Sequence, residues 1–166
     1  MAKGKSSLKN RLARFQAAGC LEVASFQPDT GRQSLADVCC RLMRQVGPLE
    51  DEEAARLTEF LEGEPTFTPD RATGWVVGML AADLAYGTSA DDALMDDARL
   101  RAIEDDVIEA LGPAAHWYAT GDHPLSRFRP ADSGRGWMSL TPATYDLLLA
   151  ARGNGFDLVL FRTQED

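Results

Sequence analysis

The chain has 166 residues, of which 45% are hydrophobic and 26% are charged. This length suits one domain of roughly 100–200 residues, and the balance excludes a collagen, a low-complexity chain and a wholly disordered chain. No apolar run approaches the roughly 18 residues of a membrane-spanning helix, which argues against a membrane protein or a membrane partner. We therefore expect a single domain over residues 1–166, with residues 1–5 flexible.

Charge is distributed unevenly along the chain, whose formal net charge is −9. The first 14 residues contain five basic side chains and no acidic ones, which gives +5. The other 12 basic residues, all arginine, and all 26 acidic residues follow, which gives −14. An acidic body repels phosphate backbones, so direct nucleic-acid binding is not expected. The same charge suits a basic protein partner, although it also simply favours solubility.

The compartment is predicted to be the cytoplasm. No apolar segment of a secretory signal follows the basic residues at the N-terminus. Cys20, Cys39 and Cys40 are odd in number and two of them are adjacent, which suits reduced thiols better than a disulfide framework. His116 and His123 have no cysteine close to them in sequence, so neither a metal site nor a cofactor is predicted.

Amphipathic helices are predicted through the first two-thirds of the chain, because apolar residues recur there at helical spacing. They cover residues 6–18, 34–46, 50–62, 70–86 and 90–111. Glycine residues follow most of them, as is common at helix ends. We expect residues 6–111 to be the mainly helical part of the fold.

The helix over residues 34–46 has the clearest signature. Ser34 and Asp37 form the Ser-x-x-acid capping pattern at its start. An apolar stripe at i, i+3, i+4 and i+7 spacing follows and includes Cys39. Cys40 lies about 100° further round the helix, at the edge of the stripe or outside it. A thiol within a core stripe usually acts as a small hydrophobic group, so Cys39 is not expected to be a nucleophile.

Acidic residues dominate the last predicted helix. An unbroken helix would turn Asp96 and Asp97 toward the core, where an unpaired carboxylate is costly. We therefore predict a break or bend at residues 96–99. The outward face of the second segment then carries Asp105, Asp106 and Glu109.

The last third of the chain has mixed signals. Strands are predicted over residues 116–119, 125–128, 137–140 and 156–161, the last of them central and covered on both faces. A helix over residues 145–152 is predicted to follow Thr141-Pro142 and to cross over the sheet. The expected fold class is therefore α+β: a helical N-terminal two-thirds packed with a small C-terminal sheet of three or four strands, plus one crossover helix, over residues 114–162.

No motif identifies a reaction. The chain has neither a Gly-x-Ser-x-Gly elbow nor a Gly-Lys-Ser/Thr phosphate loop. Gly153-Asn154-Gly155 follows a predicted helix rather than a strand, which is the wrong place for a phosphate loop. None of the three cysteines has a catalytic signature around it. A non-catalytic protein is therefore favoured.

One segment offers an alternative, a small enzyme or ligand-binding domain built between His116 and Arg127. The polar and aromatic residues gathered there are His116, Trp117, Tyr118, Asp122, His123, Ser126 and Arg127. A hairpin with Trp117 packed inward and His123 on an exposed turn explains the same residues without a site.

The preferred hypothesis starts from the acidic stretches 50–64 and 91–109, which hold fifteen acids between them. If folding gathers them on one side, they form a negative patch that can occupy the basic groove of a nuclease, toxin or CRISPR-type effector. An inhibitor of the immunity-protein or anti-CRISPR kind is thus predicted. The candidate partner-binding residues are Asp91, Asp92, Asp96, Asp97, Asp105, Asp106 and Glu109. A third possibility is an assembly subunit whose basic N-terminal segment docks on an acidic surface.

Overall fold

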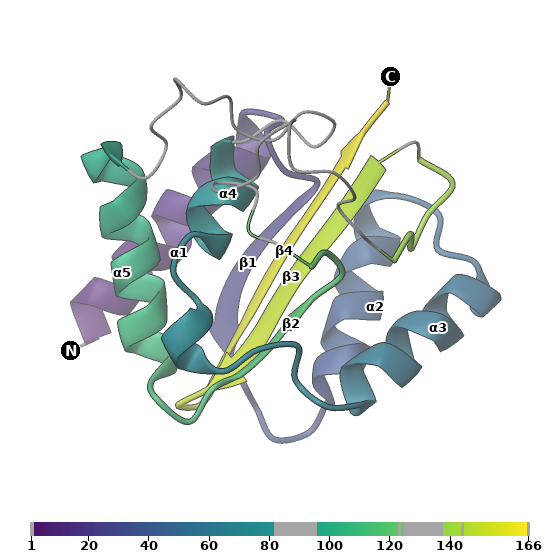
Figure 1. The fold of residues 1–166 in the computed structure, drawn as a ribbon. Helices are drawn as coiled ribbons and strands as arrows, with labels where there is room; N and C mark the ends of the chain where they lie inside the picture. The colour runs from purple at the N-terminus through teal and green to yellow at the C-terminus, as the bar shows by residue number, and fades with distance from the viewer. Residues whose placement is uncertain (1, 82–95, 123, 125–137, 144, 166) are drawn as a thin grey trace.

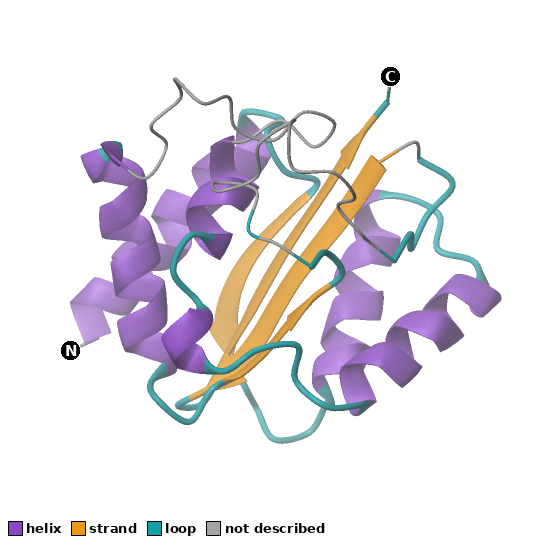
Figure 2. Ribbon diagram, viewed as in Figure 1, coloured by secondary structure: helices purple, strands orange, loops and turns teal. Residues whose placement is uncertain are grey.

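A four-stranded antiparallel sheet lies between two layers of helices in the computed structural model (Figure 1, Figure 2). The structure describes residues 2–81, 96–122, 124, 138–143 and 145–165. The elements are α1 (Ala2–Ala17), β1 (Val23–Pro28), α2 (Leu35–Val46), α3 (Asp51–Glu62), the 3-10 helix η1 (Pro69–Arg71), α4 (Trp75–Ala81), α5 (Ala98–Leu111), β2 (His116–Ala119), β3 (Tyr145–Gly153) and β4 (Phe156–Gln164). The predicted α+β class is confirmed. No helix within the described residues has the length and apolar character needed to cross a membrane.

The strand order is β1-β4-β3-β2, so β3 and β4 are central. Side chains alternate along both strands between two cores. Leu158 and Leu160 of β4 belong to the core beneath α1, α4 and α5, whereas Val159 and Phe161 belong to the core beneath α2 and α3. Both faces of the sheet are therefore covered by helices, as predicted for residues 156–161.

The basic N-terminal segment is part of the fold. The helix α1 begins at Ala2, four residues before the predicted start. Leu8 and Leu12 are 2% and 0% exposed and pack in the core with α4 and α5. Removal of residues 1–14 would therefore take core side chains away, so this segment is not a detachable leader.

The helices α2 and α3 follow the sequence prediction closely. Ser34 accepts a hydrogen bond from the Asp37 amide at 3.0 Å, and the Asp37 carboxylate accepts one from the Ser34 amide at 3.3 Å, so the predicted capping box is present. Cys39 is fully buried, as expected from its place in the apolar stripe. Cys40 is also buried, at 9% exposure, because α3 packs against that side of α2.

The predicted helix over residues 145–152 is wrong, since these residues form most of β3. Leucine and alanine favour helices, but the continuous apolar run in this segment also suits a strand covered on both faces. The deciding feature is the two-residue connection between β3 and β4, formed by Asn154 and Gly155. Both have positive φ angles, of 48° and 75°, as a type I′ hairpin turn requires. The Asn-Gly pair is therefore a hairpin turn and not a helix stop.

The strands predicted over residues 125–128 and 137–140 have different outcomes. The predicted strand over residues 125–128 lies outside the described residues. Met138, Ser139 and Leu140 are described and do not form a strand. The fourth strand is β1, from the N-terminal third of the chain, which pairs with β4 at the sheet's other side.

The helix predicted over residues 70–86 starts too early, because Pro69–Arg71 form η1 and α4 begins only at Trp75, whereas the predicted break at residues 96–99 agrees with the structure. Of the helix predicted over residues 70–86, the structure describes α4, and residues 82–95 lie outside the description. The helix α5 begins at Ala98, within the predicted break. The Asp97 side chain accepts hydrogen bonds from the amides of Arg99 and Leu100, at 3.0 and 3.2 Å, and so caps the helix.

Glu104 is a buried acid that joins α5 to α4. Its carboxylate accepts hydrogen bonds from the amides of Gly74 at 2.8 Å and Val77 at 3.0 Å, at the beginning of α4. The first amides of a helix generally lack acceptors within the helix, and the Glu104 carboxylate is an acceptor for these two. Burial raises the pKa of Glu104 above its ordinary value of 4.5, and the hydrogen bonds from the α4 amides lower it in part. Glu104 therefore stabilises the packing of two helices and is not surface charge.

We predict that Glu104→Ala lowers the free energy of unfolding by about 2–3 kcal/mol, because two buried amides lose their acceptor. Because the pKa of Glu104 is raised in the native state, its contribution to the free energy of unfolding is complete below pH 4.5. That contribution declines as the pH rises through the native pKa. Urea denaturation of wild type and variant should thus differ more at pH 4 than at pH 7. Asp105→Ala, at the exposed neighbouring position, should change stability by no more than about 0.5 kcal/mol.

We predict that Gly155→Ala lowers the free energy of unfolding by about 1–2 kcal/mol, because a Cβ atom is strained at positive φ. Gly47, at the end of α2, is the matched control, since its φ of −175° is open to any residue and nothing lies within 4 Å of an added Cβ. Thermal unfolding of the two variants compares them directly. Equal effects at both positions would contradict the turn assigned here.

Candidate functional site

The acids predicted to bind a partner have different surroundings. Asp91 and Asp92 lie outside the described residues. Asp96 and Asp97 are exposed at the start of α5, but the oxygen of Asp97 that caps the helix is already committed to two amides. Asp97 therefore has a structural role, whereas Asp96 forms no salt bridge among the described residues.

The outward face of α5 carries Asp105, Asp106 and Glu109, and all three are exposed as predicted. Asp106 forms an ion pair with Arg11 of α1, which offsets its charge. Among the described residues, neither Asp105 nor Glu109 has a salt-bridge partner. These two carboxylates lie four residues apart, so they occupy the same side of adjacent turns.

The described parts of the two acidic stretches do not form one patch. The helix α3, which carries most of the acids of residues 50–64, packs on one side of the sheet with α2. The helix α5 packs on the other side with α1 and α4 (Figure 1). The condition that folding gathers both stretches on one side is therefore not met by α3 and the described residues 96–109, because the sheet lies between them. Any acidic interface has to be argued from one side alone.

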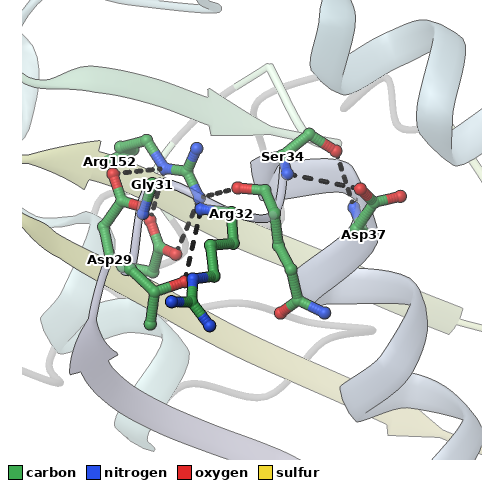
Figure 3. A network of polar contacts seen from close by, with 9 residues as sticks. Asp29, Gly31, Arg32, Ser34, Asp37 and Arg152 are labelled. Atoms are coloured by element: carbon green, nitrogen blue, oxygen red, sulfur yellow. Dashed lines mark hydrogen bonds and ion pairs between the residues drawn. The ribbon is translucent and has the colours of Figure 1, made fainter.

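A polar network joins the β3–β4 hairpin to the loop between β1 and α2 (Figure 3). The Arg152 guanidinium donates to both oxygens of Asp157, with Nε to Oδ1 at 2.7 Å and Nη2 to Oδ2 at 2.9 Å. Its Nη2 also donates to the Gln33 carbonyl at 2.9 Å, and Asp29 Oδ2 lies 3.4 Å from its Nε. Asp157 is only 1% exposed. Hydrogen bonding to Asp157 raises the pKa of Arg152, which remains charged.

This network borders an open cavity of about 240 Å³, whose rim includes Arg41. Sequence reasoning missed it, because its members come from the β1–α2 loop, α2 and the hairpin. Cys39 lies nearby, but burial raises the pKa of its thiol, which stays protonated and is a poor nucleophile. The Nε and Nη2 groups of Arg152 already donate hydrogen bonds to Asp157 and Gln33 within the fold. We therefore regard the network as an anchor for the loop.

The alternative site between His116 and Arg127 is described only in part. Trp117 is fully buried in one core and stacks on Phe67 at 5.7 Å between ring centroids. Tyr118 is buried in the opposite core, and burial raises the pKa of its phenol. His116 is exposed. His123, Ser126 and Arg127 lie outside the described residues, so a ligand site there remains a prediction.

Metal binding has no visible basis in the described parts of the chain. There, no group of three or more histidine, cysteine, aspartate or glutamate side chains is arranged to hold a metal ion. The exposed thiol is Cys20, whereas Cys39 and Cys40 are both buried.

We predict that Arg152→Ala lowers the free energy of unfolding by about 3 kcal/mol, because it leaves the buried Asp157 carboxylate without its partner. Adding Asp157→Ala to that variant should recover part of the loss, since the uncompensated charge is then gone. Arg41→Ala, at the exposed rim of the same cavity, should cost no more than about 0.5 kcal/mol. Chemical denaturation measures all three; equal losses for Arg152→Ala and Arg41→Ala would show that Arg152 is no anchor.

Comparisons of the chain with protein-family models, with curated proteins and with solved structures find no match.

Proposed function

We propose that this chain is a protein-binding module that binds a basic partner through the outward face of α5. The partner would be a nucleic-acid-binding protein such as a nuclease, a toxin or a CRISPR-type effector. The bound module would block the basic surface that the partner offers to nucleic acid. The proposed function is thus inhibition by occupation, as in immunity and anti-CRISPR proteins.

The proposal rests on the exposure of Asp105 and Glu109 and on their lack of salt bridges in the described part of the chain. Both side chains are exposed on one side of adjacent turns of α5, and no arginine or lysine in the described residues forms a salt bridge with either. Asp96 adds an exposed carboxylate at the start of the same helix. In contrast to Glu104 and Asp97, these acids have no hydrogen-bonding role in the described fold, so their charge is available to a partner.

The net charge of the chain also favours a basic partner. Residues 15–166 carry a net charge of −14, so a basic protein is attracted before contact is made. Complementary charge of this kind raises the association rate and suppresses wrong partners more than it raises affinity. The encounter should therefore weaken strongly with salt, because exposed charges are screened beyond about 8 Å at physiological ionic strength.

We predict that the double variant Asp105→Asn/Glu109→Gln binds the partner about tenfold more weakly than wild type, through a slower association. The immobilised full chain would first be used to retain proteins from a lysate of its source at about 50 mM salt. A retained basic protein would then be purified, and its affinity and nucleic-acid binding measured with the chain present at low and high salt.

The control variant is Glu59→Gln/Glu62→Gln on α3, which removes the same charge on the opposite side of the sheet. Its affinity for the partner should stay close to that of wild type. The proposal fails if no basic protein is retained at low salt, if both double variants bind alike, or if the partner still binds nucleic acid when saturated with the chain.

A further inference from the structure

A groove of about 360 Å³ runs between α1 and α5, on the side of the sheet away from α2 and α3. Its lining includes apolar side chains, namely Phe15 of α1, Ala18 directly after α1 and Ile103 of α5. Three arginines also line it, Arg11 and Arg14 of α1 and Arg99 of α5. A volume of this size is within the range of small-molecule sites.

The three guanidiniums converge from distant parts of the chain onto an otherwise acidic protein. Arg11 is paired with Asp106. In the part of the chain that the structure describes, neither Arg14 nor Arg99 has a salt-bridge partner. Like charges brought together repel one another, so this arrangement is unfavourable unless an anion joins it. Among the described residues, the groove thus carries two positive charges without a paired acid, which an anionic ligand would offset.

A second observation concerns hydrogen bonding at the same place. The Nε atom of Arg11 is buried, and it has no hydrogen-bond acceptor among the described residues. A buried donor without an acceptor is uncommon in folded proteins and costs free energy. This Nε is closed off from the groove, but Arg14 and Arg99 are exposed there, and guanidinium groups match carboxylate and phosphate oxygens in pairs.

We infer that this groove binds a small amphipathic anion, an oxyanion head group on an apolar body. The head, a phosphate or a carboxylate, contacts Arg14 and Arg99. The apolar body lies on Phe15 and Ile103. This site is separate from the proposed partner-binding acids, because Arg99 and Ile103 line the groove whereas Asp105 and Glu109 do not.

The experiment titrates the full chain with phenyl phosphate and follows backbone amide shifts by NMR. Phenylacetate tests the carboxylate head, inorganic phosphate tests the head without an apolar body, and 2-phenylethylamine tests the body with a reversed charge. We expect saturable shifts at Arg14, Cys20 and Arg99 with phenyl phosphate and phenylacetate. Binding of inorganic phosphate should be about tenfold weaker than that of phenyl phosphate, since it forgoes burial of the ring. 2-Phenylethylamine should produce none of these shifts.

Cys20 provides an independent readout of the location. It lines the groove and is exposed, while Cys39 and Cys40 are buried. Iodoacetamide should therefore add once to the native chain, and saturating phenyl phosphate should slow that addition severalfold. Mass spectrometry of the intact protein measures the rate.

The test variant is Arg14→Gln/Arg99→Gln, which should bind phenyl phosphate at least about tenfold more weakly by losing two charge-assisted contacts. Arg101→Gln is the control, since Arg101 is exposed on α5 and is not among the groove residues. Circular dichroism confirms that each variant is folded. The inference is overturned if the double variant and Arg101→Gln bind alike, if 2-phenylethylamine gives the same shifts, or if no anion binds at about 10 mM.

Discussion

The β3–β4 hairpin is the constraint on which the rest of the structure depends. Every helical layer packs on side chains from these two strands, which alternate between the two cores from one residue to the next. A shift of one residue in their register would exchange the two sets of side chains. The tight Asn154–Gly155 turn holds that register, because a two-residue connection fixes which residues face each other. The layers around the sheet can form only once this pairing is correct.

Buried charge then fixes how the loops and helices meet this hairpin. Arg152 and Asp157 stand opposite each other at its closed end, and their ion pair holds the loop that leads from β1 into α2. Glu104 does the same work on the other side of the sheet, where it joins α5 to the beginning of α4. Such groups are costly to bury unless their hydrogen bonds are complete. Part of the charge in this sequence therefore specifies the fold and never reaches a partner.

Sequence reasoning succeeds here where a signal is local and periodic. The capping box at Ser34 and the core position of Cys39 follow from spacing alone. The same reasoning fails for residues 145–152, because leucine and alanine favour a helix and only the Asn-Gly pair signals a hairpin. It also fails for Glu104, which the sequence shows only as one acid among many in its helix. Nothing local reveals that its carboxylate meets the amides at Gly74 and Val77, thirty and twenty-seven residues away.

The candidate surfaces were predictable to a lesser extent, for the same reason. The outward position of Asp105 and Glu109 follows from helical periodicity. The separation of the acidic stretches by the sheet does not, because periodicity orients a helix about its axis without saying which face of the sheet it covers. The arginine-lined groove is still less visible, since Arg14 and Arg99 lie far apart in sequence and belong to segments of opposite net charge.

The side of the molecule formed by α1 and α5 carries both signs of charge in separate places. Phe15 and Ile103 lie between the two helices and shape the groove, while the Arg11–Asp106 ion pair joins the helices and neutralises one charge of each sign. What remains is Arg14 and Arg99 lining the groove, and Asp105 and Glu109 on the solvent face of α5. Arg99 and Asp105 are six positions apart, which at about 100° per residue places them about 120° apart around α5. The helix α5 thus contributes to two surfaces of opposite charge, one for each of the two ligands proposed.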